Sequence, residues 1–174
     1  MPFTTPDNIY YVDSNGSTSF WEHHQNQAQS VQNKFAAYET WNSWTLTFSA
    51  GPTTLGSGGV SEGFYSRIGN LVFAEFRVEL GTGFAITGTT WQLNLPVTGY
   101  AGWGGAGSIV TLGSWSARDD NVPTHYSGSL ATSGSGNSAV WFTGTTTNRI
   151  SGTTTPFTWA AGDIVSGNLC YRSG

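Results

Sequence analysis

The chain changes its hydrophobic repeat near residue 40, and the two repeats predict two kinds of structure. Before that point, apolar and aromatic positions recur every three and four residues, which is typical of a coiled-coil seam. After it, apolar residues alternate with Thr and Ser, which is the period of a half-buried β-strand. The seam has Trp21, Ala28 and Phe35 at its a positions and His24, Val31 and Tyr38 at its d positions.

The seam predicts that residues 19–40 form a short helix that associates with copies of itself. Ser19 and Glu22 form a capping box where the heptads start. Bulky aromatic residues at a and d crowd a two-stranded seam, so three strands are favoured. The alternative is a single amphipathic helix packed on its own β domain. In the three-stranded seam, His24 either helps to fix the register of the helices or holds a metal or anion on the trimer axis.

Residues 1–18 have no periodicity and are interpreted as an extended docking arm. Ile9, Tyr10 and Tyr11 form an aromatic patch in it, and such a patch usually packs on another surface. The arm either docks to another protein or folds back on its own helix. The start of the chain lacks the basic and apolar regions of a signal peptide. No apolar run approaches the length of a membrane span, so no membrane insertion is expected.

Residues 41–174 predict a β-sandwich or jelly-roll head, so the expected fold class is mainly β. Eight to ten short strands are separated by Gly-, Ser- and Thr-rich turns, and Gly69–Asn70 is a candidate hairpin turn. The clearest strand follows this turn, with Val72, Ala74, Phe76, Val78 and Leu80 toward the core. Its opposite face carries Leu71, Phe73, Glu75, Arg77 and Glu79, directed to solvent or to a neighbouring subunit.

Three further segments of the head carry predictions that the structure can test. Trp44, Leu46 and Phe48 alternate with polar residues and predict a first strand. Residues 51–59 are rich in Gly, Ser, Thr and Pro, which is typical of a turn region. Residues 157–159 are expected to form a short strand before the last one.

Composition favours an oligomer and excludes several classes of function. Charged residues make up 9% of the 174 residues, against about 25% in a typical soluble domain. Subunit contacts would hide surface that charge otherwise keeps soluble. The net charge is −4 without a basic stripe, so no nucleic-acid partner is expected. Cys170 is the single cysteine, which excludes a disulfide framework and a cysteine-based zinc site.

The sequence offers no catalytic signature, so we expect no enzyme, no catalytic residue and no cofactor. Nucleophile elbows, phosphate loops and metal-ligand clusters are absent from it. Asp119 and Asp120, near His125, could bind calcium or form a carboxylate pair, but a solvated turn is favoured. Asp163 is expected to stabilise a turn. The acidic and basic residues of the strand after Gly69–Asn70 favour ion pairs.

Five aromatic residues lie in or near loops dominated by Gly, Ser and Thr. Aromatic rings with small polar neighbours suit the faces of sugars, because the rings stack and the hydroxyls supply direction. The alternative is that they belong to the core or to subunit contacts. The candidate ligand platform comprises Tyr100, Trp103, Trp115, Tyr126 and Trp141.

Three stretches of the chain resemble the minor tail and fibre proteins of tailed bacteriophages. Residues 65–73 read Tyr-Ser-Arg-Ile-Gly-Asn-Leu-Val-Phe, and Gly81-Thr82-Gly83 and the stretch from Thr87 to Val97 follow. This order is similar to the paired strands of the distal β domains of those proteins. Residues 157–164 with Tyr171 resemble the closing strands of the same domains. The opening residues 1–8 and the Gln/Ala-rich helix are similar to the start of short actinobacteriophage minor tail proteins.

The resemblance implies a homotrimeric virion component that is made in the host cytoplasm. Its arm would bind other virion proteins, and its head would face outward, where a host cell-surface glycan is a candidate partner. Many such fibres are longer, so a capsid-exterior fibre or decoration protein of the same architecture is the first alternative. A glycan depolymerase or a free lectin is the alternative from another class.

Overall fold

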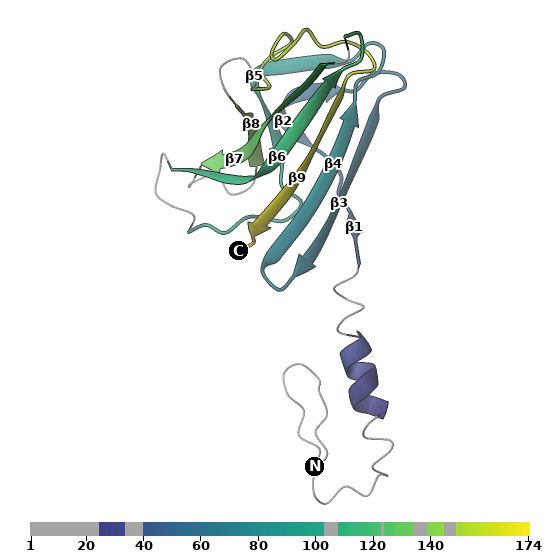
Figure 1. Cartoon of the computed structure of the whole chain (residues 1–174), viewed down its shortest axis with the longest axis vertical. Coiled ribbons are helices and arrows are strands. Elements are labelled where there is room, and N and C mark those ends of the chain that lie inside the picture. Colours follow the sequence, from purple (N-terminus) through teal and green to yellow (C-terminus); the bar gives the residue numbers. More distant parts are fainter. Residues whose placement is uncertain (1–24, 34–39, 103–107, 123, 134–138, 145–148) are drawn as a thin grey trace, which may run out of the picture. The chain divides into compact units, whose positions relative to one another are not determined.

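A computed structural model describes residues 25–33, 40–102, 108–122, 124–133, 139–144 and 149–174. The chain divides into two units, Met1–Thr40 and Trp41–Gly174. In the first unit, residues 25–33 form an α-helix (Figure 1). Two seam residues, Ala28 and Val31, lie on this helix, and both are exposed. Outside the described residues lie Trp21, His24, Phe35 and Tyr38 of the seam and Ile9, Tyr10 and Tyr11 of the arm.

The second unit is built on one antiparallel sheet, which confirms the expectation of a mainly β fold. The strands follow the order β1-β3-β4-β9-β6-β7-β8-β5-β2 across the sheet (Figure 1). They are β1 (Asn42–Ser43), β2 (Phe48–Thr54), β3 (Val60–Ile68), β4 (Leu71–Glu79), β5 (Ala85–Asn94), β6 (Ile109–Asp119), β7 (Thr124–Ser133), β8 (Ala139–Thr143) and β9 (Ile164–Arg172).

The sheet curls around its own core. Phe76 on β4 and Phe142 on β8 pack edge to face with ring centroids 5.9 Å apart, although β9, β6 and β7 separate their strands in the sheet. Trp91 on β5 also packs against Phe142 and stacks on Trp159 at 4.8 Å. One aromatic cluster therefore connects distant parts of the strand order. The other core residues include Leu93, Leu112, Ala117, Leu130, Val140, Val165 and Leu169.

Strand β4 confirms the expected alternation. Its inward residues are at most 4% exposed, and Leu80 just after it is 1% exposed. The hairpin before it is also confirmed, because Ile68 pairs with Leu71 across Gly69 and Asn70. Gly69 has a φ of 59°, a conformation that glycine adopts without steric cost. The hairpin fixes the register of β3 on β4, and with it the face to which every side chain of β3 points.

A row of alternating glycines and aromatic rings crosses the inner face of the sheet. Gly63 on β3 pairs with Phe76 on β4, Phe76 pairs with Gly167 on β9, and Gly167 pairs with Trp115 on β6. Gly128 on β7 pairs with Trp115 from the other side. A Cβ atom on Gly167 would lie 2.7 Å from the Phe76 ring. Gly167 and Gly128 therefore make room for the rings of Phe76 and Trp115, whereas a Cβ on Gly63 would meet Leu46 and the Trp44 carbonyl oxygen.

Two predicted segments differ from the structure at the edge of the sheet. Residues 44–47 belong to no strand, so of the expected strand at Trp44, Leu46 and Phe48 only Phe48 lies in a strand, β2. Residues 51–54, expected in a turn region, belong to β2 instead. Strand β2 pairs with β5 alone and contains register shifts. An irregular edge strand tolerates Gly51 and Pro52. Pro52 has no backbone N–H, and on the free side of an edge strand no neighbouring strand needs that hydrogen bond.

The expected strand at residues 157–159 is also wrong. These residues form no strand in the structure. Phe157 and Trp159 nevertheless bury their rings, at 8% and 5% exposure, and lie in contact with each other at 4.4 Å. The apolar alternation comes from a loop that inserts two rings into the core, and sequence periodicity does not distinguish such a loop from a strand.

Candidate functional site

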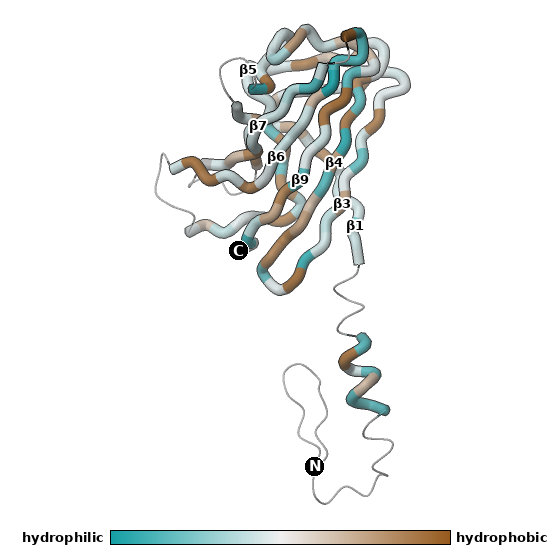
Figure 2. Tube along the Cα trace, viewed as in Figure 1, coloured by the Kyte–Doolittle hydropathy of each residue, from teal (hydrophilic) through white to brown (hydrophobic). Residues whose placement is uncertain are grey.

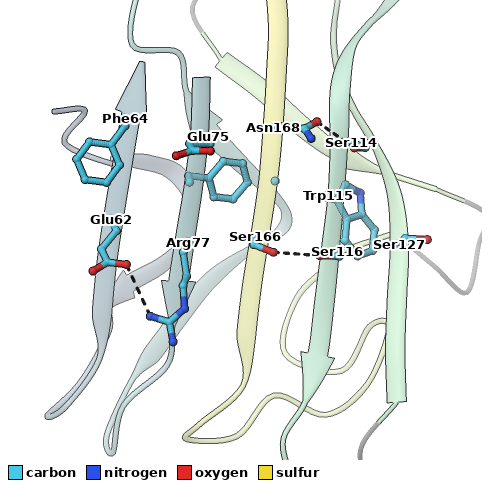
Figure 3. A pocket seen from close by; sticks show the side chains of 12 residues that line it. Glu62, Phe64, Glu75, Arg77, Ser114, Trp115, Ser116, Ser127, Ser166 and Asn168 are labelled. Carbon is cyan, nitrogen blue, oxygen red and sulfur yellow. Dashed lines mark hydrogen bonds and ion pairs between the residues drawn. The ribbon is translucent and has the colours of Figure 1, made fainter. Parts of the chain in front are cut away.

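The outer face of β3, β4, β9, β6 and β7 contains a hollow to which all five strands contribute. Its volume is about 560 Å³, and its lining includes Phe76, Trp115 and Gly167. Figure 3 shows the polar side chains around it. Two rows of outward side chains line it. The first row is Glu62, Arg77, Ser166, Ser116 and Ser127, and the second is Phe64, Glu75, Asn168 and Ser114.

The charged side of the hollow is organised by Arg77. Its guanidinium forms an ion pair with Glu62 at 3.8 Å and donates a hydrogen bond to Glu79. This agrees with the ion pairs expected for the strand. Glu75 makes no ion pair within the described part of the chain. The hollow therefore has two carboxylates against one guanidinium, which favours a neutral or cationic group over an anion.

The other side of the hollow consists of small hydrogen-bonding groups. The Ser116 and Ser166 hydroxyls lie 3.0 Å apart, and the Ser114 hydroxyl donates to the Asn168 amide oxygen at 3.1 Å. These bonds tie β6 to β9 on the outer face, as Figure 3 shows. These hydrogen bonds join side chains on neighbouring strands, and they fix the positions of those side chains beside the hollow.

The lining of the hollow does not assemble a nucleophile with a general base. It contains serines, but no histidine, cysteine or lysine. Among the described residues, no cluster of three or more His, Cys, Asp or Glu could hold a metal ion. The groups present can donate and accept hydrogen bonds, and Phe64 adds an exposed ring at the rim.

One end of the same outer face is apolar. Ile68 and Leu71 face outward at the hairpin and are 45% and 41% exposed. Figure 2 shows this end of β3 and β4 in hydrophobic colours. A second hollow, of about 380 Å³, continues the apolar surface and is lined partly by Trp41, Phe73 and Cys170. We call Trp41, Phe64, Ile68, Leu71, Phe73 and Cys170 together the apolar end.

The predicted aromatic platform does not form one surface. Trp115 is 2% exposed, and its indole N–H donates to the Thr143 carbonyl at 2.9 Å. Trp115 is therefore a core residue, and its assignment to a surface platform is corrected. Its flanking Gly113, Ser114 and Ser116 resemble a loop in composition, whereas they belong to the long strand β6.

The other platform residues have separate environments. Tyr126 is half-buried and packs on Phe157 with centroids 5.1 Å apart. Tyr100 is half-buried and lies under the Arg172 guanidinium at 4.2 Å. Trp141 is half-buried on β8, where it pairs with Gln92 of β5. Trp103 lies outside the described residues.

The acidic turn near β6 has a structural role. Asp163 is fully buried, and its carboxylate accepts the N–H groups of Ala160 at 2.6 Å and Asp120 at 2.9 Å. Burial raises the pKa of Asp163, while these two N–H donors and the nearby charges modify it less. The expected turn role of Asp163 is confirmed. Asp119 accepts the N–H groups of the two residues after Asp120, as in a turn.

The sequence contained a weak signal for the hollow that composition alone did not reveal. Ser114 and Ser116 flank Trp115, and Ser166 and Asn168 flank Gly167, so polar residues recur with period two opposite inward positions. The pairing of β6 with β9 brings the two patterns side by side. That pairing joins residues about fifty positions apart, which a local pattern does not specify.

The comparisons with known proteins identified no relative of the chain. No protein family, curated protein or solved structure matches the chain. None of the helices in the described residues has the length and apolar character required to cross a membrane.

Proposed function

We propose that this chain is a homotrimeric structural protein of a tailed-phage virion. In this proposal it is a tail-associated fibre or spike with a jelly-roll-like head that contacts the host surface. Residues 1–18 bind other virion proteins, and the seam of residues 19–40 holds three copies together.

The observation that carries the proposal is the exposure of the seam on the described helix. Ala28 and Val31 occupy consecutive a and d positions, and Val31 is 45% exposed. An apolar stripe at a and d is self-complementary, so a second helix of the same sequence covers it best. The helix described is shorter than an isolated coiled coil needs in water. The heads must therefore contribute to the assembly.

The head supports a binding role by what its outer face displays. Small polar groups, one exposed aromatic ring and an apolar end occupy one side of the sheet. Of the stretches that resemble phage tail proteins, residues 65–73 span the β3–β4 hairpin. The resemblance and the outer face thus concern the same strands.

The mass of the purified chain tests the trimer. Light scattering at micromolar concentration should give about three times the chain mass of 18.5 kDa. A matched pair of variants locates the cause. Val31→Asp places a charge in the seam and should reduce the trimer fraction, whereas Gln32→Asp, at an exposed helix position outside the seam, should not. A monodisperse monomer for the unmodified chain would contradict the proposal.

Virion incorporation tests the assignment to a particle. A tagged chain expressed during infection should be found in purified particles, and a chain lacking residues 1–18 should remain trimeric but be excluded from them. Electron microscopy of labelled particles then shows whether the tag lies on the tail or on the capsid exterior. Labelling on the capsid would replace the tail assignment with the decoration protein.

A further inference from the structure

Side chains of unequal length shape the larger hollow of the outer face, which we call the polar hollow. Strands β3 and β4 contribute the long side chains of Glu62, Phe64, Glu75 and Arg77, which form a wall. On β9, β6 and β7 the outward positions that line the hollow carry only serine and asparagine, and they form a lower floor. Figure 3 shows the long side chains on one side and the short ones on the other. A ligand placed against the wall would therefore contact the floor as well.

The floor keeps hydrogen-bonding capacity after its internal bonds have formed. The Ser114 hydroxyl donates to the side-chain oxygen of Asn168. No hydrogen bond between described residues uses the Asn168 amide nitrogen, so its two N–H groups are left for a ligand. The Ser116 and Ser166 hydroxyls share one hydrogen bond at 3.0 Å, so one of their two hydrogens is left as well. The floor therefore presents donors that need an acceptor.

The wall places acceptors beside a donor. The carboxylates of Glu62 and Glu75 only accept hydrogen bonds, whereas the guanidinium of Arg77 only donates them. Ion pairs with Glu62 and Glu79 hold that guanidinium in place. An anionic ligand would meet the two carboxylates. A cationic ligand would meet Arg77 and would offer no acceptor to the floor. The polar hollow therefore suits a neutral ligand whose groups both donate and accept hydrogen bonds.

Phe64 adds an apolar contact to the wall. It pairs with Glu75 in the register of β3 and β4, and it is 42% exposed. An exposed aromatic ring can cover the C–H groups on one face of a sugar ring, while polar neighbours bond to the hydroxyls around its edge. Each sugar hydroxyl donates one hydrogen bond and accepts others, which matches the mixture of groups in the wall and the floor.

We infer that the polar hollow is a saccharide-binding site whose ligand is a short run of neutral pyranose residues. Its volume of about 560 Å³ lies within the range of about 300–1,000 Å³ that is typical of small-ligand sites. The inference rests on the proposed function and supplies the chemistry of the contact with the host surface. The site differs from the aromatic platform predicted from the sequence, which shares only the buried Trp115 with it.

Saturation-transfer NMR on the full chain tests the site with defined probes. The neutral probes are tetramers of glucose, galactose, mannose, rhamnose and N-acetylglucosamine. The charged counterparts are a sulfated glucose tetramer and a glucosamine tetramer, the latter at slightly acidic pH, where its amines carry charge. At least one neutral probe should bind saturably, with the strongest signals from the C–H groups of one ring face. Neither charged counterpart should bind more tightly than that neutral probe.

Matched variants locate the binding. Asn168→Ala should weaken binding of the neutral probe about three- to tenfold, whereas Asn121→Ala, at an exposed turn position, should leave it unchanged. Phe64→Ala should weaken binding about three- to tenfold, whereas Ile109→Ala, 72% exposed and outside the lining, should not. Urea unfolding shows whether each variant remains folded. Glu75→Gln keeps the shape of the wall and should also weaken binding, so the test does not depend on a truncated side chain.

The outcomes separate the inference from the proposed function. Binding of a neutral probe that the variants of the hollow weaken and the two controls do not supports the inference. No saturable binding of any neutral probe, tighter binding of a charged probe, or binding that all variants of the hollow leave unchanged overturns it. A trimer that enters virions and binds no probe overturns the inference and leaves the proposed function standing. A monomer that binds a neutral probe at the hollow supports the site and contradicts the proposed trimer.

Discussion

The two faces of the β3-β4-β9-β6 sheet are completed in different ways. On the inner face, Phe76 and Trp115 lie beside glycines that leave space for their rings, so one chain fills the space. On the outer face, short polar side chains bond to one another across strands, and the apolar end stays uncovered. The inner face thus specifies the fold of one chain, whereas the outer face displays polar and apolar side chains that the chain itself leaves exposed.

The largest expected effect comes from removing an aromatic ring on the inner side. Trp91 is fully buried and packs on Phe142 and Trp159. Trp91→Ala should lower the free energy of unfolding by about 3–5 kcal/mol, as measured by urea unfolding followed by circular dichroism. The outer-face counterpart Phe64→Ala should change the unfolding of the head little, because Phe64 is 42% exposed. Equal effects of the two variants on unfolding would remove the distinction between the faces.

A smaller effect is expected from the glycine row. A Cβ on Gly167 would lie 2.7 Å from both the Phe76 ring and the Ser114 carbonyl oxygen, and the backbone oxygen has little freedom to move. Gly167→Ala should therefore cost about 1–3 kcal/mol of unfolding free energy. The neighbouring outer-face variant Ser166→Ala loses one exposed hydrogen bond and should cost about 0.5 kcal/mol or less. A neutral Gly167→Ala would show that the inner row is loosely packed.

Asp163 should make the stability of the head depend on pH. Burial raises its folded-state pKa above the ordinary value of 3.8, so the folded state binds the proton more tightly than the unfolded state does. The contribution of Asp163 to stability is therefore greatest below pH 3.8 and declines as the pH rises through the folded-state pKa.

The variant Asp163→Asn isolates this contribution. It should cost about 1–2 kcal/mol, because the amide nitrogen cannot accept the N–H bond that the second carboxyl oxygen of Asp163 accepts. The cost should be largest at acidic pH and decrease toward neutral pH, which urea unfolding at a series of pH values measures. A cost that increases with pH would contradict the raised pKa.

The smallest effect is expected at the ion pairs of the outer face. Arg77 and Glu62 are 39% and 56% exposed, so water screens their attraction. Arg77→Ala should change the unfolding free energy by about 0.5 kcal/mol or less. A loss comparable to that of Gly167→Ala would show that the margin of the hollow also stabilises the single chain.

The sequence predicted the faces of β4 because local alternation is enough to separate them. The inward residues Val72 and Phe76 were identified by period two alone, and the hairpin at Gly69 followed from its turn residues. Trp115 was misplaced because its small neighbours suggested a loop. The hollow and the glycine row required the register of β9 between β4 and β6. Long-range pairing of this kind is not encoded in the spacing of neighbouring residues.

The central position of β9 has a consequence for synthesis of the protein. The strand with the highest residue numbers, Ile164–Arg172, lies between β4 and β6. On the ribosome, β4 and β6 emerge first, and their facing edges stay without a partner until β9 leaves the exit tunnel. The head therefore completes its sheet only after translation of these residues.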